Sequence, residues 1–162
     1  MYAFILCGGI GSRLRPLTLD KPKPMVEVEG RPILWHQIQL LKKHKILDVV
    51  FLTGYKHEVV SDYFGSGESF GIRTTYSRET ENLGRGGAIK KGIESVADLG
   101  DEILVLNGDL LFNMDLHDFQ SAHSRNGSSI TMLVRKYRSE VGIVQLDNSM
   151  RITGFNEKPE MP

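Results

Sequence analysis

Short apolar runs alternate with polar turns and with segments of helical period along most of the chain. Four of these runs are long enough for buried strands and too short for helices. They predict strands at Phe4–Cys7, Asp48–Thr53, Ile72–Tyr76 and Glu102–Leu106. A continuous apolar run such as Ile103–Leu106 suits a sheet that is covered on both faces.

The segments between these strands have the three-to-four-residue spacing of helices. Pro32 suits the first turn of a helix whose apolar face carries Leu34, Ile38 and Leu41. The other predicted helices are His57–Phe64, Gly87–Ala97 and Asp115–Arg125, the last with Asp115 as its N-cap.

The pattern changes after the last of these helices. Three consecutive strands joined by turns, one of them at Asp147-Asn148, are predicted at Ser129–Val134, Val141–Leu146 and Arg151–Phe155. Strand–helix alternation followed by consecutive strands predicts an α/β fold: a doubly wound, mainly parallel, Rossmann-like sheet with an added β region near the C-terminus. We interpret residues 1–162 as a single domain. Ligands of such sheets bind beyond the carboxyl ends of the strands.

Composition narrows the partners that the chain is expected to bind. The 162 residues are 40% hydrophobic and 25% charged, with a formal net charge of +0 and no Lys/Arg run longer than a pair. Such a balance disfavours a nucleic-acid partner held by bulk electrostatics, and it is typical of soluble proteins rather than membrane proteins. Cys7, alone in an apolar run, indicates a buried thiol in a reducing compartment, which favours the cytoplasm.

A glycine-rich, basic loop follows the first predicted strand, from Gly8 to Lys23. Glycines let backbone amides surround an anion, Arg13 can offer a planar fork to phosphate oxygens, and Lys23 offers a point charge between two prolines. The other interpretation is a surface turn with solvated side chains. The loop is neither a Walker A loop nor a Rossmann fingerprint, because no Gly-Lys-[Ser/Thr] follows and Arg13 replaces the third glycine.

The segment GGIGSRLRPLTLDKPKPM (residues 8–25) resembles the signature GGxGTRLxPLTxxxPKPM of the sugar-1-phosphate nucleotidyltransferases, with Ser12 in place of threonine. The family includes glucose-1-phosphate thymidylyl- and uridylyltransferases and mannose- and heptose-1-phosphate guanylyltransferases. The resemblance implies that the NTP is bound by residues including Gly8, Gly9, Gly11, Ser12 and Arg13. It also implies catalytic roles for Arg13 and Lys23.

Asn107-Gly108-Asp109 follows the fourth predicted strand, where a carboxylate would reach the phosphates. In isolation, a turn capped by aspartate is the simpler interpretation. The resemblance implies that Asp109 is a ligand of Mg²⁺, which takes oxygen ligands and commonly only one or two carboxylates.

Glu79 and the segment at Gly84, both after the third predicted strand, are candidates for nucleotide binding. The segment at Gly84 is similar to the family's LGTAGA, which packs on base and ribose; Arg85 departs from it and either contacts phosphate or sugar or points into solvent. Glu79 lies where family members place a base-reading side chain. A carboxylate suits the adjacent N1–H and N2–H₂ donors of guanine, which favours GTP. The alternative is a solvated loop glutamate.

Near the C-terminus, VGIV (residues 141–144) and NEKP (residues 156–159) resemble the family's YGVV and EKP segments. By that resemblance Gly142 lets the sugar approach the backbone, Glu157 accepts hydrogen bonds from sugar hydroxyls, and Lys158 holds the sugar phosphate in a catalytic role. Taken alone, Glu-Lys-Pro would be an exposed turn.

The function implied is Mg²⁺-dependent transfer of a nucleotidyl group from an NTP to a sugar 1-phosphate. Family members continue beyond the part that resembles this chain, and that later part supplies a second metal-binding aspartate. We therefore expect a fragment of a longer catalytic domain. The alternative is a non-catalytic module that binds nucleotide or sugar nucleotide. The sequence does not identify the substrates or the oligomeric state, and a homo-oligomer is compatible with it.

Overall fold

The computed structural model describes residues 1–138 and 140–161. Contacts along the chain divide it into two compact units, Met1–His117 and Asp118–Pro162, and each is described by itself. The single domain expected from the sequence stays a prediction.

A four-stranded parallel sheet forms the centre of the first unit. Its strand order is β5-β4-β1-β6, so the first strand of the chain lies inside the sheet. The strands are β1 (Tyr2–Leu6), β4 (Asp48–Thr53), β5 (Arg73–Arg78) and β6 (Ile103–Asn107). All four predicted strands are confirmed, β4 with the predicted bounds and the others shifted by one or two residues.

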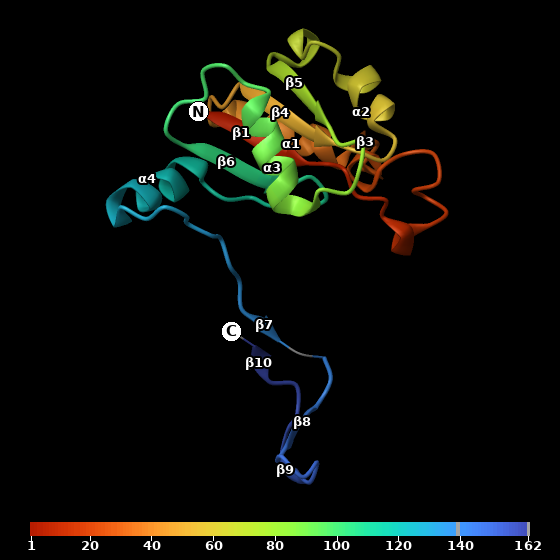
Figure 1. The fold of residues 1–162 in the computed structure, drawn as a ribbon, viewed down its shortest axis with the longest axis vertical. Coiled ribbons are helices and arrows are strands. Elements are labelled where there is room, and N and C mark those ends of the chain that lie inside the picture. Colours follow the sequence, from red (N-terminus) through yellow and green to blue (C-terminus); the bar gives the residue numbers. More distant parts are fainter. Residues whose placement is uncertain (139, 162) are drawn as a thin grey trace. The chain divides into compact units, whose positions relative to one another are not determined.

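Helices cover both faces of the sheet, as expected for a doubly wound α/β fold (Figure 1). They are α1 (Ile33–Lys43), α2 (His57–Phe64) and α3 (Gly84–Glu94). Ala88 of α3 packs with Phe4, Val50 and Leu52 on one face. The next side chain of β4, Phe51, points to the opposite face, where its ring lies 4.9 Å from that of Phe64 in α2.

The approach of α3 to the sheet depends on a glycine in the helix. A Cβ added at Gly92 would overlap Leu52 and the ring of Phe4, both of which are fully buried. Burial of side chains of this size stabilises the fold by about 1.5–3 kcal/mol each. The predicted helix Gly87–Ala97 is correct in kind, but α3 begins three residues earlier, at Gly84, and ends at Glu94.

The segment between β1 and α1 contains short elements that the sequence pattern does not predict. These are the 3-10 turns Ser12–Leu14 and Lys23–Met25 and a two-stranded hairpin of β2 (Glu27–Val28) and β3 (Arg31–Pro32). The hairpin leads directly into α1, so Pro32 precedes the helix instead of lying in its first turn.

The boundary between the units falls within α4 (Leu116–Asn126). The side chain of Asp115 accepts a hydrogen bond from the amide of His117 at 2.8 Å, as an N-cap does, which confirms the predicted start of this helix. The second unit then contains β7 (Tyr137–Arg138) paired with β10 (Glu160–Met161), and the hairpin of β8 (Ile143–Leu146) and β9 (Ile152–Asn156).

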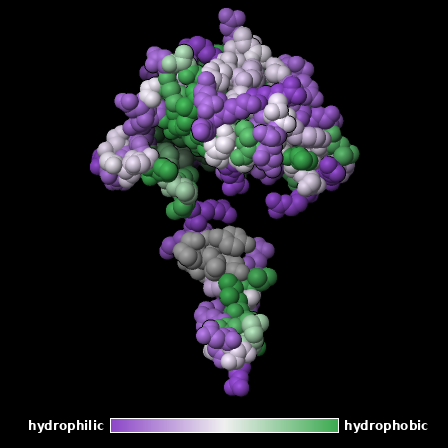
Figure 2. Space-filling view, in the orientation of Figure 1, coloured by the Kyte–Doolittle hydropathy of each residue, from purple (hydrophilic) through white to green (hydrophobic). Residues whose placement is uncertain are grey.

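The strand predicted at Ser129–Val134 is wrong, because this segment forms neither strand nor helix. A run of β-formers becomes a strand only when another strand accepts and donates its backbone hydrogen bonds, and no described strand pairs with this run. Its apolar side chains are exposed, Ile130 by 81%. Other hydrophobic side chains are exposed on the β8–β9 hairpin: Val144, Leu146, Ile152 and Phe155. Figure 2 shows green, hydrophobic surface on this part of the chain.

Candidate active site

The residues predicted to bind nucleotide and metal follow strands that end at the same edge of the sheet. The glycine-rich loop follows β1, Glu79 follows β5, and Asp109 follows β6 two residues after its end. Since the four strands are parallel, their carboxyl ends meet at one edge, which is where ligands of open α/β sheets bind. The topology therefore brings together residues that are far apart in sequence.

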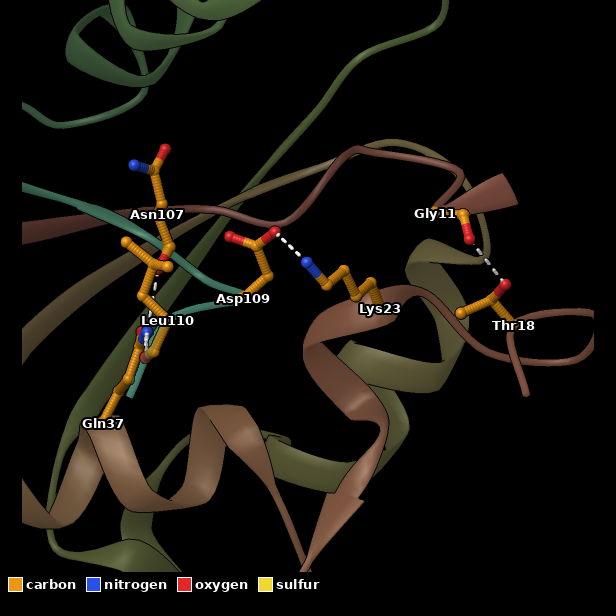
Figure 3. A network of polar contacts seen from close by, with 7 residues as sticks. All are labelled: Gly11, Thr18, Lys23, Gln37, Asn107, Asp109 and Leu110. Atoms are coloured by element: carbon orange, nitrogen blue, oxygen red, sulfur yellow. Dashed lines mark hydrogen bonds and ion pairs between the residues drawn. The ribbon is translucent and has the colours of Figure 1, made fainter. Parts of the chain in front are cut away.

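The loop after β1 folds back on itself near its tip. Gly11 adopts a left-handed conformation with φ of 65°, and its carbonyl oxygen accepts hydrogen bonds from Thr18 Oγ1 at 2.9 Å and from the amide of Leu14 at 3.0 Å (Figure 3). A Cβ at Gly11 would lie 3.0 Å from Cβ of Lys23. Gly11 thus keeps the loop in contact with the lysine, and the sequence pattern alone did not indicate that Thr18 closes it.

The predicted phosphate-binding residues of this loop differ in exposure. Gly9, Ser12 and Arg13 are exposed, so a ligand can reach them. Gly8 is half-buried because the backbone crosses that of Gly54 there: a Cβ on Gly54 would lie 3.1 Å from the carbonyl oxygen of Gly8. Gly8 therefore serves close packing of two chain segments at the sheet edge, and its contact with nucleotide stays a prediction.

Lys23 and Asp109 form an ion pair across the site (Figure 3). Lys23 Nζ donates to Asp109 Oδ2 at 2.7 Å, and the two side chains are 35% and 36% exposed. The pair joins the end of the glycine-rich loop to the turn after β6. It is partly open to solvent, so an incoming phosphate or cation can compete for either partner.

A buried glutamine holds the turn that carries Asp109. Gln37 of α1 donates from Nε2 to the carbonyl oxygens of Asn107 at 2.8 Å and Leu110 at 2.6 Å. Helical periodicity alone does not single out Gln37, although the sequence holds a signal: this polar residue lies between Leu34 and Ile38 on the apolar side of the predicted helix.

The residues predicted to contact the base lie beyond β5. The backbone of Glu79 continues the pairing of β5 with β4 by donating to the carbonyl oxygen of Thr53 at 2.8 Å, and its side chain is half-buried. Lys91 of α3 donates to the carbonyl oxygen of Arg78 at 2.6 Å and so fixes the residue before it. Gly84, with φ of 67°, is exposed at the start of α3, as is Arg85.

The residues predicted to bind the sugar belong to the second unit. The β8–β9 hairpin brings Gly142 close to Glu157: a Cβ on Gly142 would overlap the ring of Phe155 and lie 3.2 Å from Glu157 Oε2. Lys158 follows with a positive φ of 43°. The hairpin thus gathers Gly142 and Glu157, while the proximity of any of these three residues to Asp109 stays a prediction.

Cys7 directly follows β1, but its side chain does not reach solvent at the site. It is buried, as predicted, and burial raises the pKa of its thiol, so the side chain stays protonated and unreactive at neutral pH. No described helix is long and apolar enough to cross a membrane.

A family model described as "Nucleotidyl transferase" matches residues 2–162. The chain belongs to this family. Its nucleotidyl transferase relatives include the D-glycero-alpha-D-manno-heptose 1-phosphate guanylyltransferase of Campylobacter jejuni, which is 39% identical over 160 residues, with 98% of this chain and 69% of the relative covered. The mannose-1-phosphate guanylyltransferase 1 of Arabidopsis thaliana is 36% identical over 166 residues, with 99% and 46% covered. The chain thus spans about half the length of the plant relative.

The nucleotidyl transferase fold is also found among solved structures. A candidate glucose-1-phosphate thymidylyltransferase from Bacillus anthracis, in complex with sucrose, superimposes with a TM-score of 0.70 at 26% identity. The match covers 98% of this chain and 65% of that one. The predicted family and the predicted α/β fold are therefore both confirmed.

Proposed function

We propose that the chain forms the nucleotide-binding part of a sugar-1-phosphate guanylyltransferase, which converts GTP and a sugar 1-phosphate into a GDP-sugar and pyrophosphate. The observation that carries the proposal is the 2.7 Å contact between Lys23 Nζ and Asp109 Oδ2 at the carboxyl edge of the sheet. It puts the cation of the glycine-rich loop and a carboxylate suited to Mg²⁺ within reach of one phosphate chain.

The reaction needs no covalent intermediate on the protein. An oxygen of the sugar phosphate attacks the α-phosphorus of GTP in line, the bond from this phosphorus to the β-phosphate oxygen breaks, and pyrophosphate leaves with its electron pair. Arg13 and the loop amides would bind the triphosphate and stabilise the charge that develops on pyrophosphate. Lys23 would bind a reacting phosphate, and Lys158 would orient the sugar phosphate.

The residues at the edge fit a magnesium ion shared with the nucleotide. Among residues 1–138 and 140–161, no group of three or more His, Cys, Asp or Glu side chains could hold a metal ion. Asp109 offers hard oxygen ligands that solvent can reach, and Mg²⁺ is commonly held by one or two carboxylates together with substrate phosphates. Bound there, Mg²⁺ would neutralise charge on the phosphate oxygens.

Glu79 supports guanine as the base. Its position at the end of β5 is held through Thr53 and through the contact of Lys91 with Arg78, and its carboxylate can accept from two adjacent guanine donors. Relatives named as guanylyltransferases, 39% and 36% identical, support the same base. Their names also favour a mannose-like hexose or heptose 1-phosphate as the acceptor.

Pyrophosphate release tests the proposal, measured with each of the four common NTPs and with mannose and heptose 1-phosphates. We expect release to require Mg²⁺, to be fastest with GTP, and to be abolished in Asp109→Asn. No release from the chain or from a longer protein containing it would contradict the enzymatic proposal. GTP binding without release from either would favour a nucleotide-binding module instead.

A further inference from the structure

Gln37 is a polar side chain in an apolar environment. It lies on the buried face of α1 with Leu34, Ile38 and Leu41, and only 2% of it is exposed. A buried amide without hydrogen bonds costs stability, so a glutamine at such a position needs partners. Its two partners are carbonyl oxygens at the end of β6 and in the turn that follows it.

The two hydrogen bonds enclose the turn that carries Asp109. Nε2 has two hydrogens, and it donates one to the carbonyl oxygen of Asn107, the last residue of β6, and the other to that of Leu110. Gly108 and Asp109 are the residues between these two carbonyls. Figure 3 shows Gln37 on one side of this turn, with the Asp109 side chain directed toward Lys23.

The opposite side of the turn is held by backbone contacts. The amide of Gly108 donates to the carbonyl oxygen of Leu6 at 3.0 Å. A Cβ on Gly108 would lie 2.8 Å from that same oxygen and 3.1 Å from Cγ of Pro24, the residue after Lys23. The turn therefore has no space to shift toward β1, and Gln37 prevents it from moving away.

The chemistry of the contact requires an amide nitrogen. Both partners are carbonyl oxygens, so rotating the amide group by half a turn would place Oε1 against two acceptors. Oε1 itself has no hydrogen-bond partner among the described residues. The side chain thus leaves one buried acceptor unsatisfied while using both of its donors on the turn, which is the expected arrangement if fixing the turn outweighs that cost.

We propose that Gln37 is a positioning residue that holds the carboxylate of Asp109 where it binds the metal of the metal–nucleotide complex. The proposal rests on the proposed function, in which Asp109 is a Mg²⁺ ligand. Gln37 is buried, so it would act not by contact with metal or substrate but through the backbone on both sides of Asp109. Residues of this kind typically change metal affinity by roughly 10–100-fold when they are removed.

The test measures the dissociation constant of GTP by calorimetric titration, once in the presence of Mg²⁺ and once in the presence of EDTA. It is done on the wild-type chain and on its variants. The ratio of the two dissociation constants is the metal-linked gain in affinity. We expect Gln37→Met, which is similar in size and has no donor, to reduce this gain roughly 10-fold while GTP binding in EDTA changes little. Gln39→Met, a substitution of a half-buried glutamine in the same helix, is the matched control and should keep the gain.

Two further variants separate the possible causes. Gln37→Glu keeps the shape but sets a carboxylate against two carbonyl oxygens, so we expect an equal or larger loss. In an Asp109→Asn background, Gln37→Met should reduce the gain no further, because both changes act through one ligand. Backbone amide exchange at Gly108–Leu110 should be faster in Gln37→Met.

The inference and the proposed function fail in different ways. If Asp109→Asn reduces the metal-linked gain but Gln37→Met and Gln37→Glu retain it in full, the positioning role is wrong and the metal assignment stands. A multiplicative loss in the double variant would also overturn the positioning role. If wild type shows no gain, or Asp109→Asn retains it, the metal assignment fails and the inference fails with it.

Discussion

The loop after β1 is long and exposed, whereas the turn after β6 is short and held from two sides. Gly9, Ser12 and Arg13 of the loop are open to solvent. Farther along the loop, Tyr55 Oη donates hydrogen bonds from outside to the carbonyl oxygens of Thr18 and Leu19. The turn is fixed by Gln37 on one side and by Leu6 on the other. The difference matches the proposed tasks, because a loop that surrounds a triphosphate must adapt to it, while a metal ligand must keep one position.

Of the changes that test this comparison, the one with the largest expected effect lies in the exposed loop. Arg13→Ala should lower pyrophosphate release about 100–1,000-fold, the range found when one donor to a developing charge is removed, with an unchanged melting temperature because the side chain is exposed. Arg15→Ala, which removes the other exposed arginine of the loop, is the control and should retain most activity. Near-normal release from Arg13→Ala would show that the loop binds phosphate without this side chain.

A second effect concerns the base. Glu79→Gln should reduce the preference for GTP over the other NTPs by about 1–3 kcal/mol, since the amide presents a donor to one of the two guanine donors. Comparison of kcat/KM for the NTPs measures this preference, and Glu81→Gln in the same segment is the matched control. An unchanged preference would remove Glu79 from the base contact.

The short turn should respond to substitution with a loss of stability. Gly108→Ala places a methyl group 2.8 Å from the carbonyl oxygen of Leu6, so the turn must shift, at a cost of about 1–3 kcal/mol in the free energy of unfolding. Gly86→Ala meets no atom within 4 Å and should not destabilise the fold. Denaturant titration of both variants measures this difference. Equal free energies of unfolding for the two variants would show that the turn is not constrained at Gly108.

The smallest effect tests whether the loop has internal order of its own. Thr18→Val removes the 2.9 Å hydrogen bond to Gly11 and should cost about 0.5–1.5 kcal/mol of stability. Thr75→Val is the control: Thr75 is half-buried in β5, and valine suits a strand, so we expect little loss of stability. If Thr18→Val and Thr75→Val change the denaturation midpoint equally, the Thr18 contact does not stabilise the loop.

The sequence predicts the regular elements well where local pattern decides them. The strand Asp48–Thr53 and the helix His57–Phe64 have the predicted bounds because each begins at a polar residue and is followed by a glycine. The start of α3 was placed too late because glycines weaken helices, and Gly84, Gly86 and Gly87 lie in its first turn. The strand expected at Ser129–Val134 fails because pairing depends on a partner, which a local pattern does not contain.

For the candidate site, the positions of motifs after strands indicate which residues the fold brings near one another. Lys23 and Asp109 are separated by 86 residues, and their contact follows from the parallel order of β1 and β6, not from local spacing. Helical periodicity does not reveal the role of Gln37, because it considers only the spacing of apolar positions and gives no weight to a polar residue among them. Its role becomes visible only when the partners of its amide are known.

The strand order has a consequence for how the protein folds. β1 is the first strand in the chain and β6 the last of the sheet, yet they are neighbours in it. Pairing β6 with β1 closes a long segment of chain, and this costs more chain entropy than pairing β4 with β5, which are closer in sequence. Gain of nucleotide binding during refolding should therefore lag behind the formation of helices, and a ligand added at intervals would report on the last steps of assembly.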